Sequence, residues 1–544
     1  MQRLLIMATA ALTFLTLTVG CSPDTEVATG KNAGNEPVKA VTLCENWKFE
    51  HFYTVLTPEN SNNLGPFFYL VNFYETLVNY EDGQIVPGLA ESWSISADGL
   101  VYTFKLKRGV KFSDGSDFNA DVVKKNLEMI PVISGEYDGA LAPVTPLFKE
   151  IKVIDPYTVE MHLTSPYYGA LQDFTKLNPL GMMSAHAFNE DGTLSERLLT
   201  STMGTGPYMC AGPSNDGSFT FIKNPHYHGK EPEVDQFHVK VIPDNQAKAL
   251  ALRSGEIDLI LGSSKISYDS YKEIAANKKY GAKASGPNGR TRFIAFNVAK
   301  APFDDRQVRL AVSHALDKES ICNNLFYGIE NKADTLFNRT LPYCDVAVEP
   351  YQHDPERAKK ILEEAGWHDT DGDGIREKDG QKLAGEILYA SNLGPDTDLV
   401  LTISSALKKL GFDMQENGLD IMAWYAQTQQ GNFSITYATT YEIPVVPFTS
   451  ISNMNSELQV DNIMVQGPAH LADGDHIIME LNTMIDRQEI QNTYAYLLHE
   501  IHRHIAFVPI SYMKELVVFD AEKIADYRFN GQPSSLDVAG IKLK

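Results

Sequence analysis

The sequence predicts a mixed α/β fold. Some short segments alternate apolar and polar side chains, as half-buried strands do, and others have the apolar spacing and terminal residues of helices. The two kinds of segment alternate along 544 residues without a fixed repeat, which argues against a solenoid or a propeller. A chain of this length has room for several structural units with real hydrophobic cores.

The first clear strand and helix lie about one fifth of the way along the chain. Residues 101–106 alternate as a strand, and Asp114-Gly115 is a turn signal in the segment that follows. We expect Asp117 to cap the next helix, whose apolar positions include Val122.

Two later elements have equally clear boundaries. Residues 157–163 alternate as a strand after the turn at Asp155-Pro156. Residues 354–366 predict a helix with an Asp as its N-cap, Pro at its first position and Gly just past its end.

The charge balance excludes one class of partner. The chain has 47 Lys and Arg against 70 Asp and Glu, a formal net charge of −23. An acidic surface repels phosphate backbones, and no local basic stripe offsets it, so we expect no nucleic-acid partner. Hydrophobic residues at 43% and charged residues at 22% are typical of a soluble globular protein.

The N-terminus predicts export. Arg3 gives a positive start, and the apolar run at residues 4–19 is shorter than the roughly 20 residues of a membrane span, so residues 1–20 are interpreted as a signal peptide. Residues 17–21 resemble a bacterial lipobox, which implies that Cys21 receives a lipid; the alternative is a plain signal peptide. Residues 21–40 are then a flexible tether. We expect a lipid-anchored protein that faces the periplasm or the outer cell surface.

Four further cysteines are available for pairing in an exported protein: Cys44, Cys210, Cys322 and Cys344. They allow three connectivities. Cys322 and Cys344 enclose a loop-like stretch and are the preferred disulfide. No Cys or His spacing suggests zinc.

Eight short motifs follow one another in a fixed order along the chain. They begin with VPGLAESW at residues 86–93 and continue at 98–104, 109–115, 204–208, 255–258, 296–297, 308–311 and 365–367. Together they resemble family 5 of the bacterial extracellular solute-binding proteins, which deliver peptides, nickel complexes and related cargo to ABC importers. Residues 333–337, 375–378 and 509–512 are most similar to the nickel-binding branch.

The resemblance implies an α/β two-lobed periplasmic-binding-protein fold of type II, with hinge strands and a ligand cleft between the lobes. Lobe one comprises residues 41–287 plus 508–544, and lobe two comprises residues 288–507. The implied protein is a monomer without catalytic activity or a cofactor, and its partners are its cargo, ABC permease subunits and, through the lipid, the membrane.

The resemblance also places the ligand-binding residues. Phe67, Asn178 and Ser534 fall where the nickel branch has cleft contacts. Asn178 replaces an expected arginine, and a neutral amide cannot grip a carboxylate as a guanidinium fork does. Tyr441 stands where an aromatic ring stacks on cargo. Glu442, the only carboxylate in residues 439–447, can hold a cation.

These residues do not decide which cargo the protein binds. The first interpretation is a nickel or other transition-metal complex, whose direct metal ligands stay unknown. The alternative is an oligopeptide or dipeptide, and a second alternative is a surface receptor or hydrolase on the same fold. Residues 369–374 match the first half of a calcium loop, but position twelve is Gly380 rather than Glu. No nucleophile or phosphate-loop motif suggests an enzyme.

Overall fold

The structure is a computed structural model that describes residues 37–55, 57, 65–81, 83–213, 218–391, 396–442, 444–458 and 461–544. The predicted signal peptide, Cys21 and most of the predicted tether lie outside the described residues. The chain divides into two units, Met1–Lys39 and Ala40–Lys544, and the account below concerns the second unit. Among the described residues, none of the helices combines the length and the apolar character needed to cross a membrane.

A four-stranded sheet joins the start of this unit to residues far along the chain. Its order is β1-β10-β9-β8, and β1 pairs in parallel with β10, from Ala40 opposite Gln236 to Glu45 opposite Val241. The described part of the predicted tether therefore ends at β1. The strands are β1 (Ala40–Glu45), β8 (Tyr208–Pro213), β9 (Phe219–Lys223) and β10 (Gln236–Val241).

A second four-stranded sheet has the order β4-β5-β7-β6 and confirms both strands predicted in this region. Its strands are β4 (Ala90–Ile95), β5 (Val101–Leu106), β6 (Phe148–Asp155) and β7 (Thr158–Leu163). The expected helix is α1 (Ala120–Ser134), but the predicted cap was wrong. Asn119 accepts the hydrogen bond from Val122 N at 3.1 Å, because Asp117 is engaged with Lys111 in an isolated β-bridge and an ion pair.

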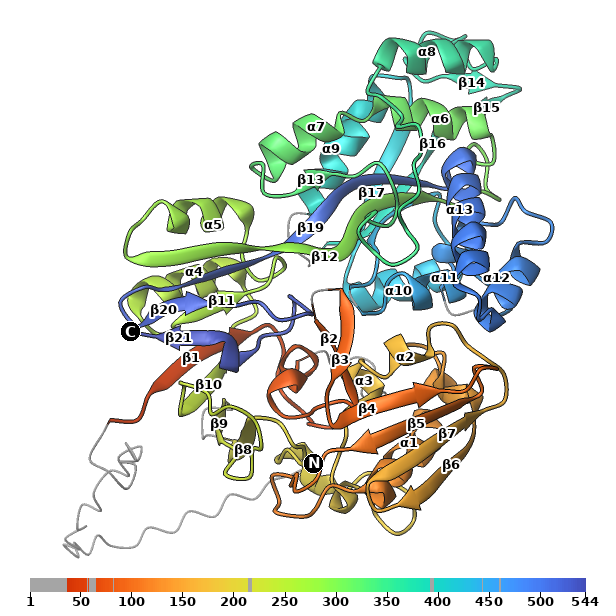
Figure 1. Cartoon of the computed structure of the whole chain (residues 1–544). Helices are drawn as coiled ribbons and strands as arrows, with labels where there is room; N and C mark the ends of the chain where they lie inside the picture. Colours follow the sequence, from red (N-terminus) through yellow and green to blue (C-terminus); the bar gives the residue numbers. More distant parts are fainter. Residues whose placement is uncertain are drawn as a thin grey trace, which may run out of the picture. The chain divides into compact units, whose positions relative to one another are not determined.

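The largest sheet is built around two long strands, β12 (Tyr280–Phe296) and β19 (Phe507–Asp520), which run side by side and antiparallel (Figure 1). Along β19, Val508 and Ile510 pack in one hydrophobic core, whereas Phe519 packs in another. The two strands therefore pass from one core to the other. The neighbouring strands are β11 (Leu259–Leu261), β13 (Asn331–Lys332), β16 (Ala384–Ala390), β17 (Asp413–Leu419) and β18 (Ile435–Thr439).

Three hydrophobic clusters make up the interior. The lobe-one core draws on residues between Val41 and Leu261 and on the C-terminal tail from Val517 to Ile541, and the two lobe-two cores draw chiefly on residues between Phe293 and Val518. Helices α4 (Asn245–Ser254) and α5 (Tyr268–Ala275) also pack in a lobe-two core, although they precede residue 288.

Short hairpins and helices complete the fold. Before residue 288 and after residue 507 these are β2 (Val78–Glu81), β3 (Gln84–Pro87), β20 (Ile524–Tyr527), β21 (Ile541–Leu543), α2 (Ala170–Asp173) and α3 (Leu177–Leu180). Between residues 288 and 507 they are β14 (Glu377–Lys378), β15 (Gln381–Lys382), α6 (Arg306–Ala315), α7 (Lys318–Ser320), α8 (Pro355–Glu364), α9 (Asp396–Lys408), α10 (Ile421–Gln429), α11 (Phe448–Ser452), α12 (Gly474–Thr483) and α13 (Arg487–His504).

Helix α8 forms as predicted. The Asp354 side chain accepts a hydrogen bond from Arg357 N at 2.9 Å and so caps the helix, and Gly366 has a φ of 89° just beyond its end. Ala358 and Leu362, four residues apart, are the buried positions, so one stripe of α8 faces the core.

The predicted disulfide between Cys322 and Cys344 was wrong. All four described cysteines are free and buried. Cys322 packs with the lobe-two core of Phe296 and Ile387, whereas Cys344 packs in the other lobe-two core with Tyr494. Because the two thiols are surrounded by different cores, they do not meet, and burial raises the pKa of Cys322 to about 12.

A network of buried charged side chains connects the two long strands. Arg292 of β12 donates through Nε to Glu330 Oε2 at 3.0 Å and through Nη1 to Asp396 Oδ1 at 3.1 Å. Ser511 of β19 donates to the same Glu330 oxygen at 2.5 Å. The Arg292 side chain is 3% exposed and that of Glu330 is 0% exposed, so the guanidinium depends on these acceptors in place of water.

Candidate ligand-binding site

The structure brings together two of the predicted ligand-binding residues, Glu442 and Ser534. Glu442 follows β18 in lobe two, and Ser534 lies in the C-terminal tail of lobe one, between β20 and β21. Ser534 N donates to Glu442 Oε1 at 2.9 Å, and the Ser534 hydroxyl donates to Glu442 Oε2. One residue of the C-terminal tail thus holds both oxygens of a carboxylate that follows β18.

Two charged residues of the long strands face this carboxylate. Glu515 of β19 lies in its electrostatic field, and Arg290 of β12 places Nη1 4.0 Å from Glu515 Oε1. Burial, followed by repulsion from Glu515, raises the pKa of Glu442 to about 8. Arg290 also donates to Thr439 Oγ1 at 2.8 Å, and Glu515 accepts from Ser263 N at 2.6 Å. With its pKa raised in this way, Glu442 keeps a proton near neutral pH, and a cation bound beside it would favour the ionised form.

An aromatic surface adjoins the acidic group. Tyr441 precedes Glu442 and donates through its hydroxyl to Asp461 Oδ2 at 3.3 Å. The Asp461 carboxylate raises the pKa of Tyr441 well above its ordinary value, and Tyr425 of α10 adds to that effect. Tyr441 is 36% exposed, Tyr425 47% and Met422 41%, so large side chains that usually pack inside are open to solvent here.

Phe67 lies near the tail that carries Ser534. It begins the 3-10 helix η1 (Phe67–Asn72) and packs edge-on against Phe68, with ring centroids 5.7 Å apart. Leu536 N donates to Phe68 O at 2.8 Å, which joins η1 to the segment two residues after Ser534.

Asn178 stands apart from this group. It has non-helical backbone angles, φ −108° and ψ 111°, inside α3. Its Oδ1 is buried and accepts no hydrogen bond from the part of the chain that the structure describes. Lys176, two residues before Asn178, contacts the segment after β18: its Nζ donates to Thr449 Oγ1 at 2.7 Å.

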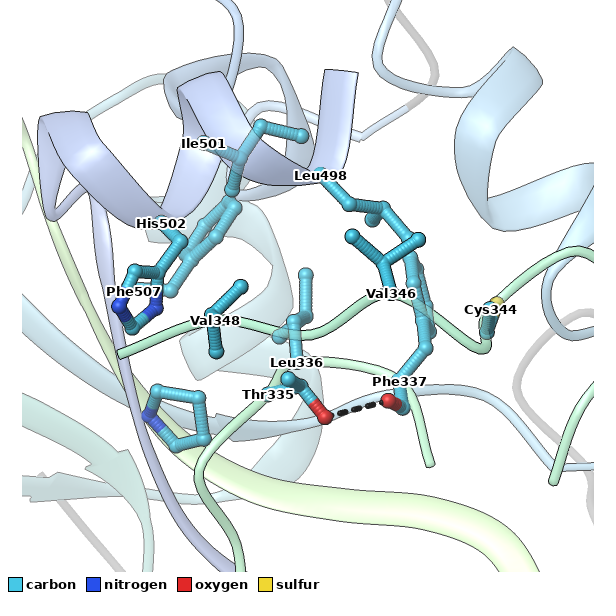
Figure 2. Close-up of a pocket in the computed structure, with 11 residues that line it drawn as sticks. Thr335, Leu336, Phe337, Cys344, Val346, Val348, Leu498, Ile501, His502 and Phe507 are labelled. Atoms are coloured by element: carbon cyan, nitrogen blue, oxygen red, sulfur yellow. Dashed lines mark hydrogen bonds between the residues drawn. The ribbon is translucent and has the colours of Figure 1, made fainter. Parts of the chain in front are cut away.

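Two pockets among the described residues do not contain the predicted residues. The first is mostly apolar and has a volume of about 30 Å³. Its lining, drawn in Figure 2, includes Leu336, Phe337, Val346, Leu498 and Phe507. A space of that size holds about one water molecule and is too small for cargo. A more open, polar groove of about 380 Å³ lies elsewhere in lobe two and is lined by Lys300, Glu386, Leu388, Asn417, Leu419, Ala423, Gln427 and Asn432.

The acidic turn that resembles a calcium loop brings carboxylates of Asp369, Asp371 and Asp373 within 4.8 Å of one another, all exposed. Their oxygens are already used: Asp369 Oδ1 accepts from Gly372 N at 2.7 Å, and Lys382 pairs with both Asp371 and Asp373. An ammonium and backbone amides therefore balance this cluster in the structure.

Four histidines, two near the C-terminal end of α13 and two between β9 and β10, lie at a helix end or on the surface. His502 and His504 are in the last turn of α13, just before β19. Arg309 approaches His504 at 3.3 Å, and burial together with this cation lowers the pKa of His504 to about 3. A neighbouring guanidinium disfavours a metal cation at that ring. His226 and His228 are exposed, and His228 Nε2 lies 2.9 Å from Glu75 Oε2.

Sequence reasoning missed Arg290, Glu515, Tyr425 and Asp461. Arg290 and Glu515 lie within strands, where the pairing register decides which side chains face the site. The sequence offered one signal for Tyr425, because residues 421–425 are almost all apolar. In the structure, Thr428 is nevertheless the one residue of α10 that is buried.

A two-lobed fold with paired long strands that run from one core to another is the architecture of solute-binding proteins. Comparison with known proteins specifies the class further. The description "Bacterial extracellular solute-binding proteins, family 5 Middle" matches residues 84–462, so the chain belongs to family 5 of these proteins.

Individual relatives bind different cargo. The nickel-binding periplasmic protein of Escherichia coli (strain K12) is 30% identical over 478 residues, which cover 86% of this chain and 90% of that protein. The dipeptide-binding protein of the same strain is 30% identical over 317 residues, 54% of this chain and 58% of that protein. The crystal structure of NikA from Brucella suis in complex with Fe(III)-EDTA superposes with a TM-score of 0.85 at 28% identity, covering 93% of this chain and 100% of that chain.

Proposed function

We propose that this protein captures a nickel or other transition-metal complex between its lobes and delivers it to an ABC permease. The observation that carries the proposal is the pair of carboxyl groups of Glu442 and Glu515, with Arg290 beside them. A cationic complex favours the ionised form of Glu442 and is attracted by it, whereas an anionic complex is disfavoured. Similarity over 90% of the nickel-binding periplasmic protein supports metal-bearing cargo.

The proposal includes the boundaries and the anchor expected from the sequence. Lobe one comprises residues 41–287 plus 508–544, lobe two comprises residues 288–507, and β12 with β19 forms the hinge. Cys21 carries a lipid that holds the exported, monomeric protein at the membrane. Mass spectrometry of the protein isolated from membranes tests the anchor: a lipid on Cys21 is expected, and an N-terminus beyond residue 21 would exclude it.

Phe67, Tyr441, Glu442 and Ser534 form the cargo contacts in this proposal. Tyr441 and Tyr425 supply an aromatic surface on which organic parts of a metal complex stack, and Glu442 receives the positive charge. Asn178 is a further predicted contact that lies apart from this group; its Oδ1 accepts no hydrogen bond from the residues that the structure describes.

A short peptide is the second candidate cargo. The observation that favours it is the same carboxylate, because Glu442 can accept hydrogen bonds from a peptide α-ammonium group, and a dipeptide-binding relative exists in the family.

Isothermal titration of the demetallated protein separates the candidates. The arms are nickel(II) chloride, the nickel(II) complex of L-histidine, and a pool of di- to pentapeptides. We expect binding of the metal complex and none of free peptides. Strong peptide binding with no response to metal would reject the metal cargo, and turnover of a peptide or ester would favour a hydrolase instead.

A further inference from the structure

A buried ammonium group bridges the lobes on the side of α11. Lys176, between α2 and α3, is flanked by residues of the lobe-one core such as Phe174 and Leu180. Its Nζ donates to the hydroxyl of Thr449, in a helix flanked by Val446 and Ile451 of a lobe-two core, at 2.7 Å.

The ammonium group has a full set of partners only when the lobes are together. Lys176 Nζ donates to Asp173 Oδ1 at 2.5 Å, to Leu141 O at 2.7 Å and to Thr449 Oγ1 at 2.7 Å. An ammonium has three N–H donors, so these three acceptors satisfy it. Asp173 and Leu141 belong to lobe one and stay with Lys176 when the lobes separate. Thr449 is the one partner among these three that leaves.

Because Lys176 is buried, the hydrogen bond to Thr449 affects the free energy of the closed protein. The side chain of Lys176 is 3% exposed and that of Asp173 is 0% exposed. Burial lowers the pKa of Lys176 and raises that of Asp173, which reflects the cost of removing both charges from water. If Thr449 lacked its hydroxyl, one N–H of the buried ammonium would be unsatisfied in the closed protein, whereas water would satisfy it in the open protein.

The bond is connected to the proposed cargo contact along the chain. Thr449 N donates to Val445 O at 3.0 Å, and Val445 N donates to Glu442 O at 2.8 Å. Gln172 Nε2 also lies 3.5 Å from Pro444 O in the same segment. The residues from Glu442 to Thr449 that the structure describes therefore join the cargo contact to the Lys176 contact.

We propose that Lys176, oriented by Asp173, is a closure residue that binds Thr449 only in the closed protein and so raises cargo affinity without touching cargo. The proposal rests on the proposed function, in which the lobes close on cargo. A ligand that binds the closed form is held more tightly when that form is more populated.

Thr449→Val tests the proposal, because valine has the shape of threonine without the hydroxyl. Thr449→Ser keeps the hydroxyl and is the matched control, and Thr449→Ala removes the same hydroxyl if the valine variant does not fold. Titration with the nickel(II) complex of L-histidine measures affinity. Small-angle X-ray scattering, with and without that complex, measures the radius of gyration.

We expect Thr449→Val to bind the complex about tenfold more weakly and to have a larger radius of gyration, while Thr449→Ser resembles the wild type. Unchanged affinity, or an unchanged radius, in Thr449→Val would overturn the closure role. If the wild type does not bind the complex, the proposed metal cargo is wrong. The closure role is then tested without cargo: the radius of gyration of Thr449→Val must exceed that of the wild type.

Discussion

Ser534 holds both carboxylate oxygens of Glu442, one through its backbone N–H at 2.9 Å and the other through its hydroxyl. The two residues are 92 positions apart in the sequence. The tail residue thus fixes the orientation of the carboxylate in this structure.

Replacing Glu442 by Gln should weaken the binding of a cationic metal complex by about 1 to 3 kcal/mol, the range for a hydrogen bond to a charged group. Glutamine keeps an oxygen that accepts from Ser534 N, so the fold should survive. Titration calorimetry with the nickel(II) complex of L-histidine measures the change. Glu457→Gln, at an exposed position of lobe two, is the control and should bind like the wild type; equal affinity in all three proteins would remove Glu442 from the cargo contacts.

The stability of the protein should fall as pH rises from about 5 to 8 through Glu442. Its pKa is raised in the folded protein to about 8 from an ordinary value of 4.5. Between these values the folded protein keeps a proton that the unfolded chain releases, so the free energy of unfolding decreases with pH. Urea unfolding at several pH values should show a shallower decrease in Glu442→Gln. Parallel curves for the two proteins would contradict the raised pKa.

Replacing Arg292 by Met should lower the free energy of unfolding by about 3 to 5 kcal/mol, because it leaves the buried Glu330 carboxylate without its cation. Urea denaturation measures this loss. Arg339 is a matched control: its pair with Asp345 is exposed, with side-chain exposures of 55% and 75%, so Arg339→Met should change stability by less than about 1 kcal/mol. Similar effects of the two substitutions would contradict a special role for the buried network.

Filling the cavity of Figure 2 should stabilise the protein. Val346→Ile adds one methylene group toward a space of about 30 Å³, and burying that group contributes roughly 0.5 to 1 kcal/mol. Val41 is fully buried in the lobe-one core and does not line this cavity, so Val41→Ile should instead destabilise by overpacking. Thermal unfolding of both variants measures the difference, and a loss of stability in Val346→Ile would show that the cavity cannot accept the group.

The four described cysteines should behave as free, protected thiols. We expect Ellman's reagent to react slowly with the native protein and to detect Cys44, Cys210, Cys322 and Cys344 after denaturation without a reductant. Burial also raises the pKa of the Cys44 thiol to about 12, which disfavours the reactive thiolate. Two missing thiols in the denatured protein would restore the disulfide.

Elements with strong local signals could be predicted from the sequence. The helix at residues 354–366 has its cap, its proline and its final glycine within a dozen residues, and α8 forms there. The cap of α1 could not be predicted in the same way. Asp117 is as good a cap as Asn119 by residue type, but its pairing with Lys111 across a β-bridge removes it from the helix.

The candidate site was predictable only in part. Tyr441, Glu442 and Ser534 followed from the family resemblance, and the structure joins the last two. Arg290 and Glu515 did not, because a strand residue faces the site or turns away from it according to the register of β12 against β19. That register shifts near Pro287 and Thr291. The alternation of side chains along β12 therefore does not by itself tell which face of the sheet Arg290 lies on.

By itself, the sequence determined the fold class, the secondary structure with strong local caps and the family of solute-binding proteins, because each depends on patterns within short segments. The tertiary structure decided the pairing of β1 with β10, the separation of Cys322 from Cys344, and the meeting of Glu442, Glu515 and Arg290. Those contacts join residues up to hundreds of positions apart, and their energies come from burial and long-range pairing, which no local pattern specifies.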